Sequence, residues 1–216
     1  MTQFDGRGFI EKLRRDYSIM RPVIEGRLEE FRRVDRSDAG RLFEELAFCI
    51  LTPQSSAKRA DAAVKELSRS GLLLNGKASD VYSVLRQWGV RFPAAKARYI
   101  ILDRRVLMGG ERLKQLLSQD GRETRDKLVK VVWGFGYKEA SHFLRNIGYK
   151  GLAIIDRHVI RGLVRIGVLR REVNLSSRRR YLMVEERFIE AAEIVGVQPE
   201  ALDLLLWFEG TGEVFK

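Results

Sequence analysis

Residues Val131–Arg161 read VVWGFGYKEASHFLRNIGYKGLAIIDRHVIR, the most informative stretch of the sequence. Gly134 and Gly136 separate two segments whose apolar residues recur at helical spacing, which predicts a helix, a glycine hairpin and a second helix. Lys138 would lie in the first turn of the second helix, and Asp156 directly before a further helix. Glycines let backbone N–H groups approach a phosphate at a helix N-terminus, but a plain tight turn uses glycines as well.

Three segments carry a resemblance to known proteins. Trp133–Ala140 reads WGFGYKEA and Ile154–His158 reads IIDRH, which resembles the helix–hairpin–helix DNA glycosylases with their hairpin close to L-P-G-V-G-x-K-x-A. Trp133 departs from that pattern. The last residues, Leu206–Lys216, read LWFEGTGEVFK and resemble the compact 8-oxoguanine DNA glycosylases of archaea and some bacteria, which end on a lysine. The resemblance covers roughly residues 42–216.

The resemblance implies an all-α fold of two helical domains, with the active site in the cleft between them. Residues 50–155 would form a six-helix, barrel-like domain that carries the helix–hairpin–helix, and residues 1–49 plus 156–216 a second domain. Amphipathic segments predict helices near 7–17, 22–34, 39–51, 57–70, 79–88, 94–108, 111–118, 122–132, 138–147, 157–168, 178–195 and 199–208. Residues suited to cap helix N-termini are Asp38, Ser56, Ser79 and Asp156.

The resemblance also implies that Lys138 and Asp156 are catalytic. The neutral amine of Lys138 would attack the anomeric carbon of the damaged nucleotide, displace the base and leave a Schiff base, from which β-elimination cuts the strand. Desolvation in the positive first turn of a helix favours the neutral amine. Asp156 would stabilise positive charge on the opening sugar. Without the motif, Lys138 would be a surface or phosphate-contacting lysine and Asp156 a plain helix cap.

Further residues are candidates for contacts with DNA. Gly134 and Gly136 would hold a phosphate, and Phe92, just before a proline, would fill the gap left when the damaged base leaves the stack. Gln54 would contact the opposite strand, and His158 a phosphate. Each has an ordinary alternative: Phe92 could be a core residue, Gln54 a loop residue, and His158 a packed side chain.

Selection of the damaged base needs an acceptor, because 8-oxoguanine carries a hydrogen-bond donor at N7 where guanine carries an acceptor. The terminal carboxylate of Lys216 is such a group, and Trp207 could stack on the extruded ring. A frayed chain end is the alternative for the tail.

Composition favours a nucleic-acid partner. The chain has 40 Lys and Arg against 29 Asp and Glu, a formal charge of +11, and an excess of this size attracts polyanions. Its single cysteine, Cys49, excludes a four-cysteine iron–sulfur cluster, and two histidines make a metal site unexpected, so we expect no cofactor. No stretch approaches the ~20 apolar residues of a membrane span, and we expect a cytoplasmic, nucleoid-associated monomer without membrane contact.

The sequence thus predicts a bifunctional 8-oxoguanine DNA glycosylase and AP lyase acting on double-stranded DNA. Two alternatives stay open. A non-enzymatic helix–hairpin–helix module would need the glycines and the charge but neither Lys138 nor Asp156. A glycosylase for other oxidised bases would share the catalytic pair, although the missing cysteine cluster and the lysine tail weigh against it.

Overall fold

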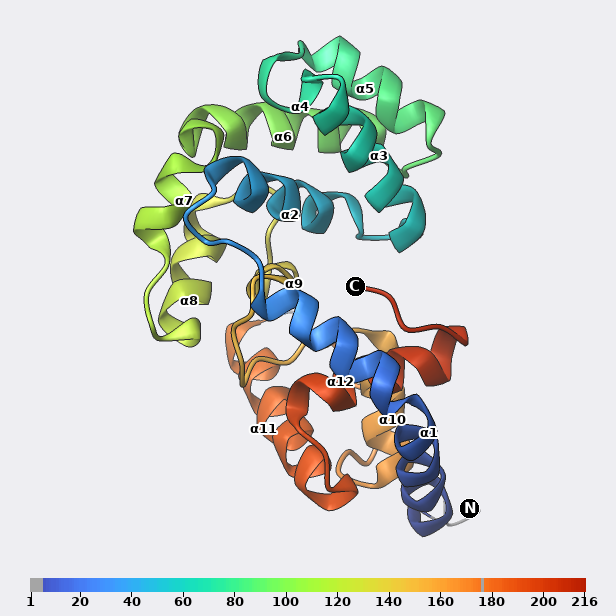
Figure 1. Cartoon of the computed structure of the whole chain (residues 1–216). Coiled ribbons are helices and arrows are strands. Elements are labelled where there is room, and N and C mark those ends of the chain that lie inside the picture. Colours follow the sequence, from blue (N-terminus) through green and yellow to red (C-terminus); the bar gives the residue numbers. More distant parts are fainter. Residues whose placement is uncertain (1–5, 176) are drawn as a thin grey trace. The chain divides into compact units, whose positions relative to one another are not determined.

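The computed structural model describes residues 6–175 and 177–216, and in these ranges the chain forms helices and loops without a β-strand (Figure 1). None of the described helices could span a membrane. The elements are α1 Gly6–Arg32, α2 Ala39–Leu51, α3 Ala57–Arg69, α4 Leu72–Asn75, α5 Ala78–Gln87, α6 Pro93–Val106, the 3₁₀ helix η1 Met108–Gly110, α7 Glu111–Leu116, α8 Gly121–Val131, α9 Tyr137–Asn146, α10 Arg157–Ile166, α11 Arg178–Val195 and α12 Pro199–Thr211.

The chain divides into two compact units. Residues 34–147 form a middle unit, and residues 1–33 together with 148–216 form an end unit. The expected boundaries near 50 and 155 therefore shift. Residues 39–51 belong to the middle unit because α2 packs against α3, α6, α7 and α9.

Several local predictions need correction. Residues 7–17 and 22–34 were expected to form two helices, but α1 is one continuous helix through Pro22, with Phe9 and Leu13 buried before the proline and Ile24, Leu28 and Phe31 buried after it. Ser79 lies inside α5, which begins one residue earlier with Lys77 as its cap. Ser56 holds the cap position of α3 without a side-chain hydrogen bond. The caps Asp38 and Asp156 are confirmed, because each side chain accepts backbone N–H bonds from the first turn.

The middle unit is built around α2. Nine of the thirteen residues in α2 are buried, and Phe43, Phe48 and Phe143 are among the fully buried side chains. Burying each such side chain contributes about 1.5–3 kcal/mol, so this apolar cluster is a substantial part of the core of the unit.

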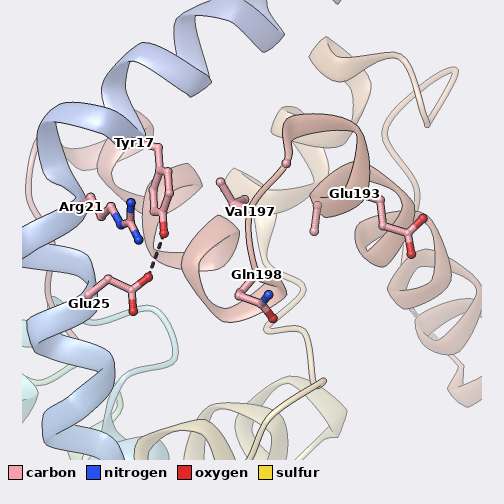
Figure 2. Close-up of a pocket in the computed structure, with 8 residues that line it drawn as sticks. Tyr17, Arg21, Glu25, Glu193, Val197 and Gln198 are labelled. Atoms are coloured by element: carbon pink, nitrogen blue, oxygen red, sulfur yellow. Dashed lines mark hydrogen bonds between the residues drawn. The ribbon is translucent and has the colours of Figure 1, made fainter.

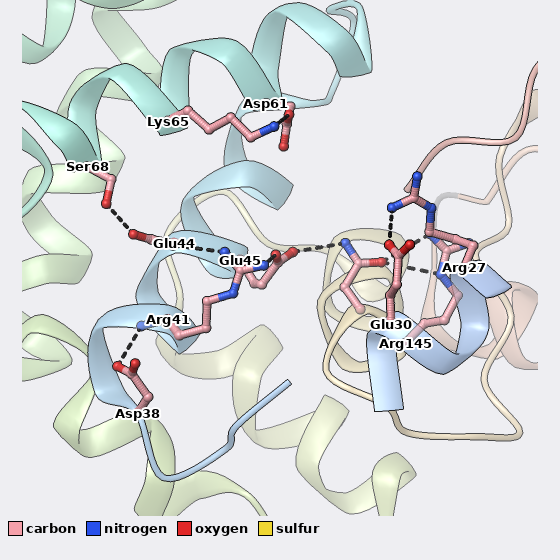
Figure 3. Close-up of polar contacts among 11 residues, drawn as sticks. Arg27, Glu30, Asp38, Arg41, Glu44, Glu45, Asp61, Lys65, Ser68 and Arg145 are labelled. Atoms are coloured by element: carbon pink, nitrogen blue, oxygen red, sulfur yellow. Dashed lines mark hydrogen bonds and ion pairs between the residues drawn. The ribbon is translucent and has the colours of Figure 1, made fainter. Parts of the chain in front are cut away.

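Polar contacts fix α2 against its neighbours (Figure 3). Arg41 donates to Glu44 and Glu45, both at 2.9 Å. Glu45 is buried, and its other oxygen accepts from Asn146 Nδ2 of α9 at 3.2 Å. Ser68 of α3 donates to Glu44. A buried carboxylate with several donors is stable in place, so these bonds set the register of α2 relative to α3 and α9.

The end unit packs α1, α10, α11 and α12 together. Helices α10 and α12 come close because Gly162 lies against Leu206, where an added Cβ would approach the leucine side chain to 2.6 Å. Leu206 and its neighbours 201–205 are buried on α12. The glycine therefore sets how near the two helices approach each other.

A buried carboxyl on α6 supports the glycine hairpin of the middle unit. Asp103 has no exposed surface, and its Oδ1 accepts from the backbone N–H of Trp133 at 2.9 Å. Its Oδ2 has no hydrogen-bond partner among the residues that the structure describes. Burial raises the pKa of Asp103 to about 7, against an ordinary value of 3.8. The Trp133 bond opposes this rise but does not cancel it.

This carboxyl predicts a pH-dependent stability. A folded-state pKa raised above the unfolded value means that the contribution is fully present below about pH 4 and is lost as the pH rises to about 7. The loss is at most about 1.4 kcal/mol per pH unit. Asp103→Asn keeps an acceptor for Trp133 and does not titrate. Between about pH 5 and about pH 8, wild-type Tm should therefore fall relative to that of the variant, measured by thermal unfolding. A constant difference would contradict the titration.

Candidate active site and DNA-binding hairpin

The hairpin needs glycine at position 134 for structural reasons. Gly134 has φ 82°, in the left-handed region, and an added Cβ would lie 2.8 Å from Cδ2 of Tyr99. An L-residue here would be strained and would displace a packed ring. Together with Asp103, Tyr99 makes α6 the surface on which the hairpin rests.

Gly136 is different. It caps α9 with φ −104° and ψ −170°, which any residue adopts, and an added Cβ would meet only the Glu139 carboxylate at 3.2 Å. Glu139 in turn accepts the Gly136 N–H at 3.1 Å. The fold itself makes little demand for a glycine here. A glycine would be needed at position 136 if another molecule approached the backbone closely there.

Lys138 occupies the first turn of α9, as expected. Its side chain is one-third exposed, and Nζ lies 3.6 Å from Glu139 Oε1. The first N–H groups of a helix have no acceptor within the helix, so Lys138 stands at the positive end of the α9 dipole. The ammonium is also near a second cation, since Lys138 and Arg91 add to burial in lowering the pKa of Lys96 to about 8.

Gln54 and Phe92 share an unusual backbone conformation. Both are non-glycine residues with positive φ, 57° and 56°, and both are exposed. Gln54 is the third residue of a turn closed by Ser55 N donating to Thr52 O at 2.9 Å. Phe92 precedes Pro93, caps α6, and leaves 55% of its surface exposed. A core role for Phe92 is therefore wrong.

Asp156 caps α10 with a single oxygen. Its Oδ1 accepts from His158 N at 2.8 Å and Val159 N at 2.9 Å, so neither cap bond uses Oδ2. The residue is partly exposed. A rigid carboxylate with one oxygen outside the cap can serve a second role, so the capping and chemical interpretations are compatible.

The segment before Asp156 is held by α11. Residues 152–155 are buried without being helical. Glu185 accepts from Ala153 N at 3.1 Å, and Tyr181 Oη accepts from Ile155 N at 3.2 Å while donating to Ala153 O at 2.6 Å. Buried backbone groups need such partners. Two side chains one helical turn apart thus fix the approach to Asp156.

His158 packs against α12. Its ring meets that of Trp207 edge to face, with centroids 5.3 Å apart. A Cβ at Gly210 would lie 2.1 Å from His158 Nδ1, so this glycine makes space for the ring. His158 and Trp207, which were singled out separately, are direct neighbours.

The C-terminal tail begins with an ordered turn. Gly212 has φ 79°, and its N–H donates to Phe208 O at 2.7 Å. Thr211 Oγ1 lies 2.8 Å from Trp207 O and 3.2 Å from Glu213 O. Residues 213–216 are half-buried, which disagrees with a frayed end.

The structure groups the candidates by unit. Gln54, Phe92, Gly134, Gly136 and Lys138 belong to the middle unit, and Asp156, His158, Trp207 and Lys216 to the end unit.

A depression of about 380 Å³ in the end unit contains none of the candidates (Figure 2). Tyr17 and Glu25 of α1, joined by a 2.8 Å hydrogen bond, line it together with residues of α11 and the loop that follows. Its open shape and its mixed lining indicate no particular ligand.

Three supporting residues on α6 were not predicted: Lys96, Tyr99 and Asp103. For Lys96 and Asp103, the sequence does contain a signal. Lys96, Ala97, Ile100 and Asp103 are the buried positions of α6 and lie at helical spacing. Charged residues at both ends of a buried stripe are uncommon and mark a polar contact inside the fold.

Comparisons with known proteins show the family of the chain. The family model for 8-oxoguanine DNA glycosylase (Ogg-HhH) matches residues 24–197. An 8-oxoguanine DNA glycosylase/AP lyase of Thermoplasma volcanium is 38% identical over 195 residues, covering 90% of this chain and 92% of the relative. The crystal structure of the 8-oxoguanine DNA glycosylase of Thermotoga maritima matches with TM-score 0.88 and 36% identity, covering 98% and 100% of the two chains.

A third comparison includes DNA. The Methanocaldococcus jannaschii 8-oxoguanine glycosylase/lyase in complex with a 15mer DNA containing 8-oxoguanine matches with TM-score 0.85 and 32% identity, covering 95% of this chain and all of that one. The family model and these relatives cover most of the sequence, so the chain belongs to the 8-oxoguanine DNA glycosylase family.

Proposed function

We propose that this protein removes 8-oxoguanine from double-stranded DNA and then cuts the strand, with Lys138 as nucleophile. The observation that carries the proposal is the combination of family membership with a partly exposed lysine in the first turn of α9, directly after the glycine hairpin. Since the substrate is genomic DNA, we place the protein at the nucleoid in the cytoplasm. We further propose that it acts as a monomer and without a cofactor.

In the first step, Nζ of neutral Lys138 forms a bond to C1′ of the damaged nucleotide. The N-glycosidic bond breaks, and its electron pair leaves with the base. Ring opening gives a Schiff base, which acidifies the proton on C2′. Loss of that proton expels the 3′ phosphate, so base removal and strand cleavage share one covalent intermediate.

Asp156 would stabilise the positive charge that develops on the sugar. Its cap bonds use Oδ1 and leave Oδ2 outside the cap. A carboxylate fixed by two backbone N–H groups needs no reorganisation when charge appears, which is the condition for effective electrostatic stabilisation.

The hairpin would hold the DNA backbone. The loops that carry the strained residues Gln54 and Phe92 would act on the stacked bases of the DNA. Gly134 and Gly136 let the N-terminus of α9 approach a phosphate. Phe92 would fill the space of the extruded base, and Gln54 would contact the opposite strand. Strained, exposed positions concentrate at functional sites, which supports both assignments.

We assign recognition of the extruded base to Trp207 and the terminal carboxylate of Lys216. The rings of His158 and Trp207 pack edge to face, which suits Trp207 as a stacking platform. A contact of His158 with a phosphate remains a separate prediction. The turn at Gly212 gives the tail a defined start.

Trapping of the intermediate tests the function directly. Wild-type protein incubated with an 8-oxoguanine duplex and borohydride should form a covalent adduct, because borohydride reduces the Schiff base. Lys138→Gln should form none while still binding DNA. Asp156→Asn, which keeps an oxygen for the cap, should slow adduct formation at least about a hundredfold with little change in Tm.

Three experimental outcomes would contradict the proposed function and indicate a different one. DNA binding without an adduct in the wild type would indicate a non-enzymatic module. An adduct with oxidised pyrimidines in preference to 8-oxoguanine would indicate a different base specificity. Full trapping by Lys138→Gln would place the nucleophile elsewhere.

The two hairpin glycines should separate folding from DNA binding. Gly136→Ala should leave the free energy of unfolding within about 1 kcal/mol of wild type but weaken binding to damaged and undamaged duplex alike, because the methyl group would stand where a phosphate approaches. Gly134→Ala should lower Tm, because it adds a left-handed L-residue and a clash with Tyr99. Fluorescence anisotropy and thermal unfolding measure the two effects, and a Gly136→Ala protein with intact affinity would remove its assignment.

The tail should govern base selection. Deleting Lys216 moves the terminal carboxylate by about 3.5 Å, more than a hydrogen bond tolerates. The ratio of excision rates for 8-oxoguanine and guanine should then fall while affinity for undamaged duplex stays constant. Addition of residues after Lys216 should act in the same direction. If both proteins keep the wild-type preference, recognition lies with the side chains around Trp207.

A further inference from the structure

Lys96 is a buried cation in the middle unit. Only 5% of the residue is exposed. Its Nζ donates to Leu51 O at 2.8 Å, Pro53 O at 2.7 Å and Ser55 Oγ at 3.1 Å. All three acceptors are uncharged. An ammonium has three hydrogens, so these bonds use every donor of the Lys96 side chain.

The three acceptors follow one another along the loop that carries Gln54. Leu51 ends α2, where the carbonyls of the last turn lack helical partners and favour a cation. Pro53 and Ser55 flank Gln54 on either side. Lys96 therefore joins the end of α2 to both neighbours of Gln54.

The loop that carries Phe92 is joined to the same point. Ser55 Oγ, which accepts from Lys96, also accepts from the backbone N–H of Arg91 at 2.9 Å. Lys96 itself lies on the first turn of α6, four residues after Phe92, and its N–H donates to Phe92 O at 3.1 Å. One side chain thus connects both loops.

Each loop contains a strained residue that needs outside support. Left-handed backbone costs an L-residue roughly 1–2 kcal/mol, and a residue before proline is restricted further. Gln54 and Phe92 both have this conformation and neither is a glycine. Such conformations persist only where surrounding contacts determine them.

We propose that Lys96 is the positioning residue for base extrusion: its three hydrogen bonds hold the loops of Gln54 and Phe92 in the paired arrangement that opens the DNA stack. Lys96 touches neither the sugar nor the base in this role. The inference rests on the proposed function, since it takes the DNA contacts of Gln54 and Phe92 from there. This positioning role explains why the ammonium of Lys96 is buried although none of its three hydrogen bonds goes to a carboxylate.

The test separates extrusion from chemistry by changing the substrate. Single-turnover rates are measured for Lys96→Met on 8-oxoguanine in a matched duplex, on 8-oxoguanine in a mismatched bubble where the base is already unstacked, and on a preformed abasic site. The matched-duplex rate should fall at least about thirtyfold, equivalent to about 2 kcal/mol. The bubble and abasic rates should fall less than about threefold.

Two further variants serve as controls. Ser55→Ala removes the hydroxyl shared by the two loops but keeps the Lys96 bonds to Leu51 O and Pro53 O, and should show the same pattern with a smaller loss. It also covers the case in which Lys96→Met does not fold. Lys65→Met removes a positive charge from an exposed lysine of α3 that pairs with Asp61, and should match wild type on all three substrates.

A readout independent of catalysis keeps the proposal testable if the wild type does not excise 8-oxoguanine. In proteins carrying Lys138→Gln, 2-aminopurine placed beside the lesion should brighten on binding, and the added Lys96→Met or Ser55→Ala change should abolish most of that increase. Equal losses on all three substrates, or unchanged fluorescence in folded variants, would overturn the positioning role. Failure of the proposed function would instead appear as an inactive wild type.

Discussion

The structure depends on one constraint: buried backbone outside a helix must find hydrogen-bond partners, and here side chains of neighbouring helices supply them. Asp103 accepts the Trp133 N–H at the hairpin, and Lys96 donates to the carbonyls around Gln54. In the end unit, Glu185 and Tyr181 accept hydrogen bonds from the backbone N–H groups of Ala153 and Ile155, just before Asp156. An unpaired buried group costs about 1–3 kcal/mol, so each of these side chains determines where a candidate functional residue lies.

Both catalytic candidates occupy helix N-termini, where the macrodipole acts on them in opposite directions. A carboxylate gains roughly 0.3–1 kcal/mol at such a position, and an ammonium loses a similar amount. Asp156 is a carboxylate at a helix N-terminus, which is the favourable arrangement, and it accepts hydrogen bonds from two backbone N–H groups. Lys138 stands in the unfavourable case, with Glu139 Oε1 at 3.6 Å as partial compensation. The two candidates therefore differ in what holds them at the helix N-terminus: two backbone hydrogen bonds for Asp156, and a neighbouring carboxylate oxygen at 3.6 Å for Lys138.

The sequence predicted what depends on short spacings. The hairpin glycines, Lys138 at the start of α9 and Asp156 capping α10 follow from local patterns, and the all-helical fold follows from periodicity. Contacts between distant segments could not be predicted in this way. The Lys96 bonds to residues 51–55 join positions more than 40 apart in the sequence. The continuity of α1 through Pro22 was not predicted; a proline inside a helix removes a backbone hydrogen bond, so local rules disfavour this arrangement.

The distribution of glycine shows which strain the fold avoids and which it keeps. At Gly134 a left-handed backbone lies against a packed ring, and a glycine removes the strain. At positions 54 and 92 the backbone is also left-handed, yet the residues are Gln and Phe. A glycine there would relieve about 1–2 kcal/mol in each loop. Selection for stability alone would favour that change. The side chains at these positions must therefore contribute something that a glycine cannot, and their exposure places that contribution outside the core.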